Sequence, residues 1–162
     1  MNLSIREFRS EDIKELTALF NEAVNEGNSL LDENPVTAEQ LQFRIENHEA
    51  ATGVALFDQT VCGAYLVKPN LKGRGSHIAN ATYIVSKKFQ KQGVGYKLCK
   101  HSLEKAKQLG FKAMQFNSVV STNTTAVNLW VKLGFKRIAT VPDGFRLSDG
   151  KYVDTYVFYL KL

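Results

Sequence analysis

The chain has 162 residues, of which 44% are hydrophobic and 23% charged, and this composition predicts a single globular domain over residues 1–162 with its own hydrophobic core. Its net charge of +5 is compatible with nucleic acid. However, the basic residues are spread along the chain without a DNA- or RNA-binding signature, and no apolar run approaches the roughly 18 residues that span a bilayer, so we expect neither a nucleic-acid nor a membrane partner.

The first half of the chain predicts a strand, two helices and a hairpin. The strand covers residues 3–8, and Ser10 is expected to cap the helix that follows it. After a polar loop, Thr37-Ala38-Glu39-Gln40 is a capping box that opens a second helix. Residues 53–57 and 61–67 flank a short polar turn and are typical of a β-hairpin.

The second half alternates strands and helices. Gly110 and Gly134 are placed to end the two helices. The predicted elements are a strand at 78–85, a helix at 94–109, a strand at 112–120, a helix at 123–133, and strands at 135–141 and 152–160. The whole order is β-α-α-β-β-β-α-β-α-β-β, which predicts an α/β (α+β) fold with one mixed sheet and helices on its faces.

A glycine-containing turn, Gln90-Lys91-Gln92-Gly93-Val94-Gly95, joins the strand at 78–85 to the helix at 94–109. The first amides of a helix have no partner within it, and the helix dipole favours an anion beside them. Glycines also let a ligand approach the backbone closely. The turn therefore predicts a site for the phosphates of a small molecule. The plainer alternative is a helix start that contains two glycines for structural reasons.

The two cysteines indicate the cellular compartment. Cys62 and Cys99 lie far apart, in a predicted strand and a predicted helix, without the spacing of a metal site or a disulfide framework. Residues 1–7 also lack the apolar centre of a signal peptide. We therefore expect buried free thiols, no metal and a cytoplasmic location.

The element order and two motifs resemble the GNAT superfamily, the GCN5-related N-acetyltransferases, over essentially the whole chain. One family motif, Gln/Arg-x-x-Gly-x-Gly/Ala after the fourth strand, is found at Gln90–Gly95. The other is an Asn that precedes a helix ending in Leu-Gly-Phe, found at Asn123 and at Leu133–Phe135. The Gly-Lys-Ser/Thr ending of a Walker loop is absent. The resemblance implies a GNAT-like acyl-CoA N-acyltransferase fold that uses acetyl-CoA and no metal.

The resemblance also implies which residues hold acetyl-CoA. Backbone amides of the turn would bind its pyrophosphate, and the end of the strand at 78–85 would pair with its pantetheine chain. The N–H of Val85 would polarise the thioester carbonyl, and Asn123 would hydrogen-bond the pantetheine as well as cap its helix. Trp130 would wall the acetyl pocket, unless it is only a core aromatic. The implied cofactor-binding residues are Ile84, Val85, Gln90, Gln92, Gly93, Val94, Gly95, Tyr96, Asn123 and Trp130.

The usual acid and base of the family cannot be carried over to this chain. Trp130 stands where many relatives have a Tyr that protonates the leaving thiolate, and an indole N–H is not a practical acid. Tyr83, Tyr65 and Tyr96 are possible substitutes. Asn80 lies in the stretch where some relatives place a Glu, and it cannot take a proton. The groups expected at the thioester are therefore Val85, Asn123 and Tyr83.

The acceptor site is the least defined part of the chain. Residues 141–146 are expected to join the last two strands near the acceptor, where Phe145 and Arg146 could contact it and Arg146 could pair with a carboxylate. The alternative is a hairpin tip with an exposed Arg. Glu33, in the loop between the first two helices, could reach the substrate, and Glu26 and His77 are further candidates for a base, none of them preferred.

These residues predict an acetyl-CoA-dependent N-acetyltransferase that acts on the primary amine of a small molecule, for example an amino acid. The amine would attack the thioester directly in a ternary complex. A protein N-terminal or lysine acetyltransferase and a non-catalytic acyl-CoA-binding module are the alternatives. Family members are often dimers, and the apolar final strand could pair or pack across such an interface.

Overall fold

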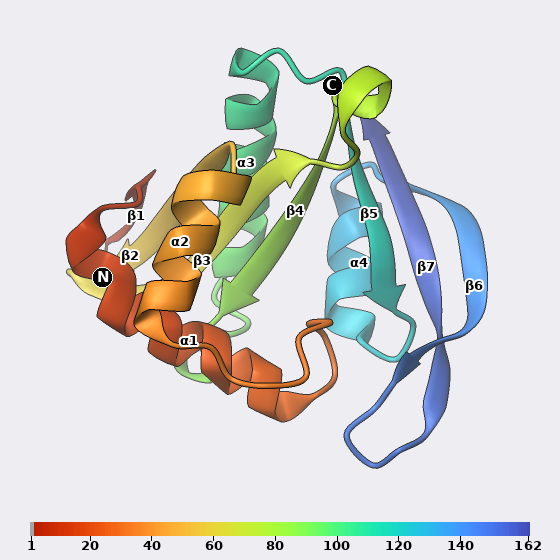
Figure 1. Cartoon of the computed structure of the whole chain (residues 1–162), viewed down its shortest axis with the longest axis horizontal. Coiled ribbons are helices and arrows are strands. Elements are labelled where there is room, and N and C mark those ends of the chain that lie inside the picture. Colours follow the sequence, from red (N-terminus) through yellow and green to blue (C-terminus); the bar gives the residue numbers. More distant parts are fainter. Residues whose placement is uncertain (1) are drawn as a thin grey trace.

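The computed structural model describes residues 2–162 as one seven-stranded sheet with four α-helices on its faces (Figure 1). The order of strands and helices is the predicted one. The strands are β1 (Leu3–Glu7), β2 (Ala51–Phe57), β3 (Thr60–Pro69), β4 (Ile78–Val85), β5 (Ala113–Val120), β6 (Lys136–Arg146) and β7 (Tyr152–Lys161). The helices are α1 (Ile13–Glu26), α2 (Ala38–His48), α3 (Val94–Gln108) and α4 (Thr124–Lys132).

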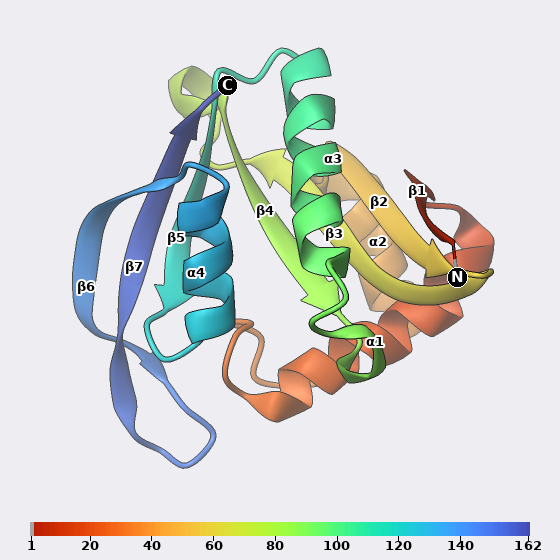
Figure 2. The same ribbon diagram turned by 180° about the vertical axis from the view of Figure 1, so that it is seen from behind.

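The strands lie in the order β1-β2-β3-β4-β5-β7-β6. Helices α1 and α2 cover one face of this sheet, and α3 and α4 cover the other (Figures 1 and 2). Each face has its own hydrophobic core, because apolar side chains alternate along the strands and meet helices on both sides. Leu16, Phe20 and Leu41 belong to the first core, and Leu98 and Met114 to the second.

The sheet opens in its middle, between β4 and β5. These two strands run parallel and pair only at Ile78–Ala113 and Ala79–Met114, after which they diverge. By contrast, β3 and β4 pair along seven positions from Gly63–Val85 to Pro69–Ala79. The carboxyl ends of β4 and β5 are therefore apart, which is where open α/β sheets commonly bind ligands.

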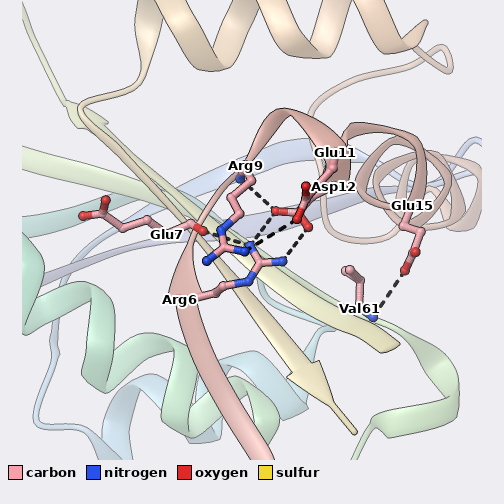
Figure 3. A network of polar contacts seen from close by, with 7 residues as sticks. All are labelled: Arg6, Glu7, Arg9, Glu11, Asp12, Glu15 and Val61. Carbon is pink, nitrogen blue, oxygen red and sulfur yellow. Dashed lines mark hydrogen bonds and ion pairs between the residues drawn. The ribbon is translucent and has the colours of Figure 1, made fainter. Parts of the chain in front are cut away.

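The start of α1 is held by Asp12 and not by the predicted cap Ser10, which is a correction to the sequence analysis. The Asp12 carboxylate accepts a hydrogen bond from the Arg9 N–H at 2.8 Å and two from the Arg6 guanidinium at 2.7 and 2.8 Å (Figure 3). Its side chain is 5% exposed, and the hydrogen bond from Arg6 keeps the pKa of Asp12 below its usual value. A carboxylate satisfies both a backbone amide and a half-buried guanidinium, which a serine hydroxyl cannot do.

The other local predictions in the first half are confirmed. Gln40 N–H donates to Thr37 Oγ1 at 3.2 Å, and Thr37 N–H donates to Gln40 Oε1 at 2.9 Å, which is the predicted capping box. The hairpin of β2 and β3 turns at Asp58 and Gln59, whose φ angles of 44° and 76° are left-handed. Two residues of this conformation form the turn that matches the twist of adjacent strands.

The last hairpin differs from the prediction at two points. Residues 142–146 are part of β6 and not a connection, because a bulge between Val141 and Phe145 accommodates them and an edge strand tolerates Pro142. Furthermore, β7 lies between β5 and β6, so both its edges are already paired and it cannot pair across an interface. The outer strands of the sheet, each with one free edge, are β1 and β6.

Cys62 and Cys99 are buried free thiols, as predicted. Burial raises the pKa of Cys62, and that of Cys99 to about 12, so both remain protonated and unreactive near neutral pH. Within residues 2–162, no helix has both the length and the apolar character required to cross a membrane.

Candidate active site in the opened sheet

A cleft of about 360 Å³ occupies the gap between β4 and β5. The α1–α2 loop contributes residues 29–31 to its wall from one face of the sheet. From the other face, Asn123, Ala126 and Trp130 contribute, at the beginning and along the length of α4. The cleft therefore has walls from both faces of the sheet.

Trp130 belongs both to the core and to the wall of this cleft. It is 7% exposed, and its ring centroid lies 4.6 Å from that of Phe116 and 5.1 Å from that of Tyr83. Phe135 stacks on Phe116 at 4.6 Å. The two interpretations of Trp130 from the sequence are thus compatible, because a side chain of this size can fill the core with one part and face a cavity with another.

The turn before α3 presents unpaired backbone amides, although its residues do not themselves line the cleft. Gly93 has a left-handed φ of 80°, and the first helical hydrogen bond runs from Lys97 N–H to the Gly93 carbonyl at 3.1 Å. The N–H groups of residues 94–96 therefore have no partner within the helix, and the first turn of α3 contains no acidic side chain. This is the arrangement of an anion site.

The two glycines of the turn have different structural roles. A Cβ at Gly93 would meet no atom within 4 Å, so this glycine is required by its backbone conformation and not by space. A Cβ at Gly95 would lie 3.4 Å from the Leu129 side chain, which is ordinary van der Waals contact, so Gly95 lies where α4 packs on α3 but space alone does not require a glycine there.

The backbone of β4 also faces the gap. Ser86 N–H donates to the Cys62 carbonyl on β3. Because successive N–H groups point to opposite edges of a strand, those of Tyr83 and Val85 point toward β5, where β4 has no partner. Ile84 and Val85 thus lie where the resemblance places a pantetheine chain, and Asn123 caps α4 by accepting from Ala126 N–H at 3.2 Å.

The hydroxyl of Tyr83 is directed to α3. Its Oη lies 2.7 Å from Ser102 Oγ, and Ser102 already donates its one hydrogen to the Cys99 carbonyl. Tyr83 must therefore be the donor to Ser102. Burial raises the pKa of Tyr83 well above its ordinary value. Both observations disfavour Tyr83 as an acid for the thiolate.

The other tyrosines are no better placed. Tyr65 Oη contacts His101 Nδ1 at 2.9 Å, burial raises the pKa of Tyr65 to about 12, and this residue does not line the cleft. Tyr96 does not line the cleft either, and the ammonium groups of Lys100 and Lys132 lie within 6 Å of its ring centroid.

Three amide side chains and one cation lie together in the wall of the cleft. Asn70 Oδ1 accepts from Asn80 Nδ2 at 3.2 Å and from Asn117 Nδ2 at 2.7 Å, and Lys68 lies beside them in the same wall. Among residues 2–162, no Asp, Glu or His side chain lines this cleft. Lys68, Asn70 and Asn117 were not predicted as site residues. The only indication of them in the sequence was a set of polar residues at the ends of apolar strands.

The predicted acceptor residues lie outside the cleft wall. Phe145 is 8% exposed and pairs with Val153 in the hairpin. Arg146 forms an ion pair with Glu33 at 2.5 Å, which ties β6 to the loop that contributes residues 29–31 to the cleft. These residues therefore support the acceptor side without lining it.

The two remaining candidates for a base are also outside the wall. Glu26 forms an ion pair with Lys87 at 3.2 Å, and His77 is exposed before β4. Within the described part of the chain, no group of three His, Cys, Asp or Glu side chains could hold a metal ion.

Residues 12–135 match the protein family described as "Acetyltransferase (GNAT) family". The chain belongs to this GNAT family. It is 36% identical to N-acetyltransferase aca1 of Schizosaccharomyces pombe over 111 residues, which are 68% of this chain and 53% of that protein. The GNAT chain described here thus spans about half the length of this curated relative.

Solved structures agree with this assignment. The GNAT chain superposes on a GCN5-related N-acetyltransferase from Kribbella flavida with a TM-score of 0.92 and 35% identity, over 99% of this chain and 98% of the other. A phosphinothricin acetyltransferase from Sinorhizobium meliloti, solved in complex with AcCoA, gives a TM-score of 0.92 at 19% identity, over 100% and 89% of the two chains. The second likeness shows the fold alone.

Proposed function

We propose that this GNAT protein is an acetyl-CoA-dependent N-acetyltransferase of small primary amines that carry a carboxylate, such as amino acids. The observation that carries the proposal is the cleft with walls from both faces of the sheet. The unpaired amides at the start of α3 are the proposed cofactor site, and the wall of Lys68 and asparagines is the proposed acceptor side of the cleft.

Acetyl-CoA would be held mainly by backbone groups. The amides of residues 92–96 are the candidates for the pyrophosphate, with the exposed Gln90 preceding them. The edge of Ile84 and Val85 and the Asn123 side chain are the candidates for the pantetheine. The acetyl-CoA found in the Sinorhizobium meliloti structure supports this choice of cofactor.

The acyl transfer itself would need few side chains. The neutral amine attacks the thioester carbonyl, the carbonyl oxygen gains negative charge, and an N–H such as that of Val85 would stabilise it. The thiolate then leaves. Because no carboxylate or imidazole among residues 2–162 lines the cleft, we propose that the ammonium proton is lost to water.

Lys68 is the proposed partner of the acceptor carboxylate. It is the cation in the acceptor wall, and the amides of Asn70 and Asn117 beside it can donate and accept further hydrogen bonds. A wall without carboxylates offers nothing to pair with a second ammonium group, which argues against polyamines as acceptors. Arg146 and Glu33 would act indirectly, by holding the loop at residues 29–31.

The direct test is thiol release from acetyl-CoA in the presence of matched amines. We expect turnover of amino acids, and about tenfold lower kcat/KM for the same amines without their carboxylate. Turnover of peptide N-termini or peptide lysines alone would favour the protein acetyltransferase. Binding of coenzyme A without turnover of any amine would favour the non-catalytic module.

We further propose that the chain forms a single catalytic domain, that it is located in the cytoplasm, and that any homodimer would form through an edge of the sheet. One sheet extends from β1 to β6, which supports a single catalytic domain over residues 1–162. The buried free thiols Cys62 and Cys99 are typical of a reducing, cytoplasmic compartment. A homodimer would use the free edge of β6, where Ile138 and Val141 are exposed, and sedimentation would detect it.

A further inference from the structure

A second cavity, of about 290 Å³, lies at the edge of the sheet where β1 ends. Its wall is formed by the end of β1, the C-terminal end of α2, the start of β2 and the C-terminal part of α3. It shares no lining residue with the cleft between β4 and β5. The proposed acetyl transfer therefore makes no use of it.

Two polar side chains in this wall are buried without a hydrogen-bond partner. The Glu49 side chain is 2% exposed and its Oε2 has no partner, and Thr52 is 8% exposed and its Oγ1 has none. They are the two buried side-chain atoms of this kind among residues 2–162. Buried polar groups are normally paired, so each exception requires an explanation. Here both exceptions belong to one cavity.

The negative charge of Glu49 is only partly compensated. Its ion-pair partner is Arg44, whose Nε lies 3.5 Å from Glu49 Oε1, which is longer than an ordinary charge-assisted hydrogen bond. The same guanidinium also contacts Asp32 at 3.4 Å and lies over the Phe20 ring. Burial raises the pKa of Glu49 in spite of the positive charges of Arg44, Lys68 and His48. A further positive charge beside Oε2 would stabilise the carboxylate.

The remaining wall restricts the chemistry of a ligand. Phe8, Ile45 and Leu109 form its apolar part, and Glu7 and Lys105 neutralise one another in an ion pair. A divalent metal would need about six oxygen ligands, which this wall does not offer. A primary alkylammonium supplies N–H donors for two oxygens, a positive charge and an alkyl chain for the apolar part.

We propose that this cavity is a second ligand site, which binds a small primary alkylammonium compound between Glu49 and Thr52. The volume suits such a molecule, because a water molecule occupies only about 30 Å³ in the liquid. The ammonium hydrogens would be donated to Glu49 Oε2 and Thr52 Oγ1, and the alkyl chain would lie against Ile45 and Phe8. No covalent step is involved, and the site is independent of acetyl-CoA.

The test is an amide NMR titration of the protein with n-butylammonium chloride, without acetyl-CoA. We expect saturable shifts at the amides of residues 49–52. Glu49→Gln should weaken the binding about tenfold or more, and Thr52→Val about threefold. Glu46→Gln is the matched control, because Glu46 is exposed in the last turn of α2, three residues before Glu49, and it should leave the binding unchanged.

Tetramethylammonium chloride separates this site from a general effect of salt, since it carries the charge but no N–H donor. It should produce no saturable shift at residues 49–52. The proposal is overturned if n-butylammonium gives no saturable shift there, or if Glu49→Gln and Thr52→Val, both folded by their amide spectra, bind it as the wild type does. If Glu49→Gln does not fold, Thr52→Val and the tetramethylammonium control still decide whether the alkylammonium compound binds at this site.

Discussion

The two sides of the cleft differ in what they are made of. The cofactor side consists mostly of backbone: the free amides that follow Gly93 and the unpaired edge of β4. The acceptor side consists of side chains, with Lys68 on β3, Asn70 after it and Asn117 on β5. A backbone site tolerates most substitutions as long as its dihedral angles are kept, whereas a side-chain site changes its ligand when a single residue changes. If both assignments hold, the fold would combine a cofactor site that tolerates substitution with an acceptor site that single substitutions can change.

The largest effect on coenzyme A binding is expected at Gly93, because its left-handed backbone conformation favours glycine. Gly93→Val places a β-branched residue at a φ of 80°, which costs about 1–3 kcal/mol if the turn is kept, or displaces the amides if it is not. We expect coenzyme A to bind about 100-fold more weakly by calorimetry.

The matched control for this variant is Gly93→Asn, because Asn tolerates the left-handed region better than other residues with a side chain. It should retain most of the affinity. Normal binding by a folded Gly93→Val protein would contradict the assignment of the turn as the pyrophosphate site.

The second-largest effect is expected at Lys68, where a substitution should impair the use of the acceptor without changing the binding of coenzyme A. Lys68→Met should lower kcat/KM for amino acids about tenfold, because it removes a charged partner of the carboxylate. It should leave the affinity for coenzyme A unchanged, and also the rate with amines that lack a carboxylate. Lys72→Met, an exposed change in the loop after β3, is the control. If Lys68→Met weakened coenzyme A binding equally, the division into two sides would be wrong.

A smaller effect, on kcat, is expected when the hydroxyl of Tyr83 is removed. Tyr83→Phe removes a hydroxyl that donates to Ser102 and not to the cleft, so kcat should fall by no more than about threefold. The pH profile of kcat/KM should keep its shape. It should rise with pH as the acceptor's ammonium group loses its proton and becomes the neutral amine. A fall of two orders of magnitude, or a lost limb of that profile, would instead make Tyr83 the acid.

The smallest effect on the cleft is expected at Asp12, which lies far from it in the fold but stabilises the chain. Asp12→Asn should lower the free energy of unfolding by about 2 kcal/mol at neutral pH and leave both substrate affinities unchanged. The pKa of Asp12 is lowered in the folded state, so its stabilisation is present above the unfolded pKa of about 3.9 and is lost as pH falls through the folded value. Denaturant titrations from pH 7 to pH 3 should therefore converge for the two proteins.

The parts of the molecule that the sequence predicted are those that depend on local rules. The turn at Gln90–Gly95, the capping box at Thr37 and the helix ends at Gly110 and Gly134 follow from dihedral preferences and unpaired backbone groups, which neighbouring residues determine. The family membership follows from two such local motifs at the right distance.

The parts that the sequence did not predict depend on contacts between distant segments. Lys68, Asn70 and Asn117 come into one cleft wall because β4 and β5 separate after two paired positions, which no residue of either strand indicates. Asp12 replaced Ser10 as the cap because a guanidinium from β1 reaches it. Phe145 was expected in a turn because Pro142 and Gly144 usually form one, whereas the edge of a sheet accommodated both.

The cleft between β4 and β5 has walls from both faces of the sheet, and this has a kinetic consequence. A cleft built from both faces of the sheet can hold both substrates of the proposed transfer at once, so that the amine would attack the thioester in one ternary complex. Initial-rate plots should therefore give intersecting lines, and each product should compete with its own precursor.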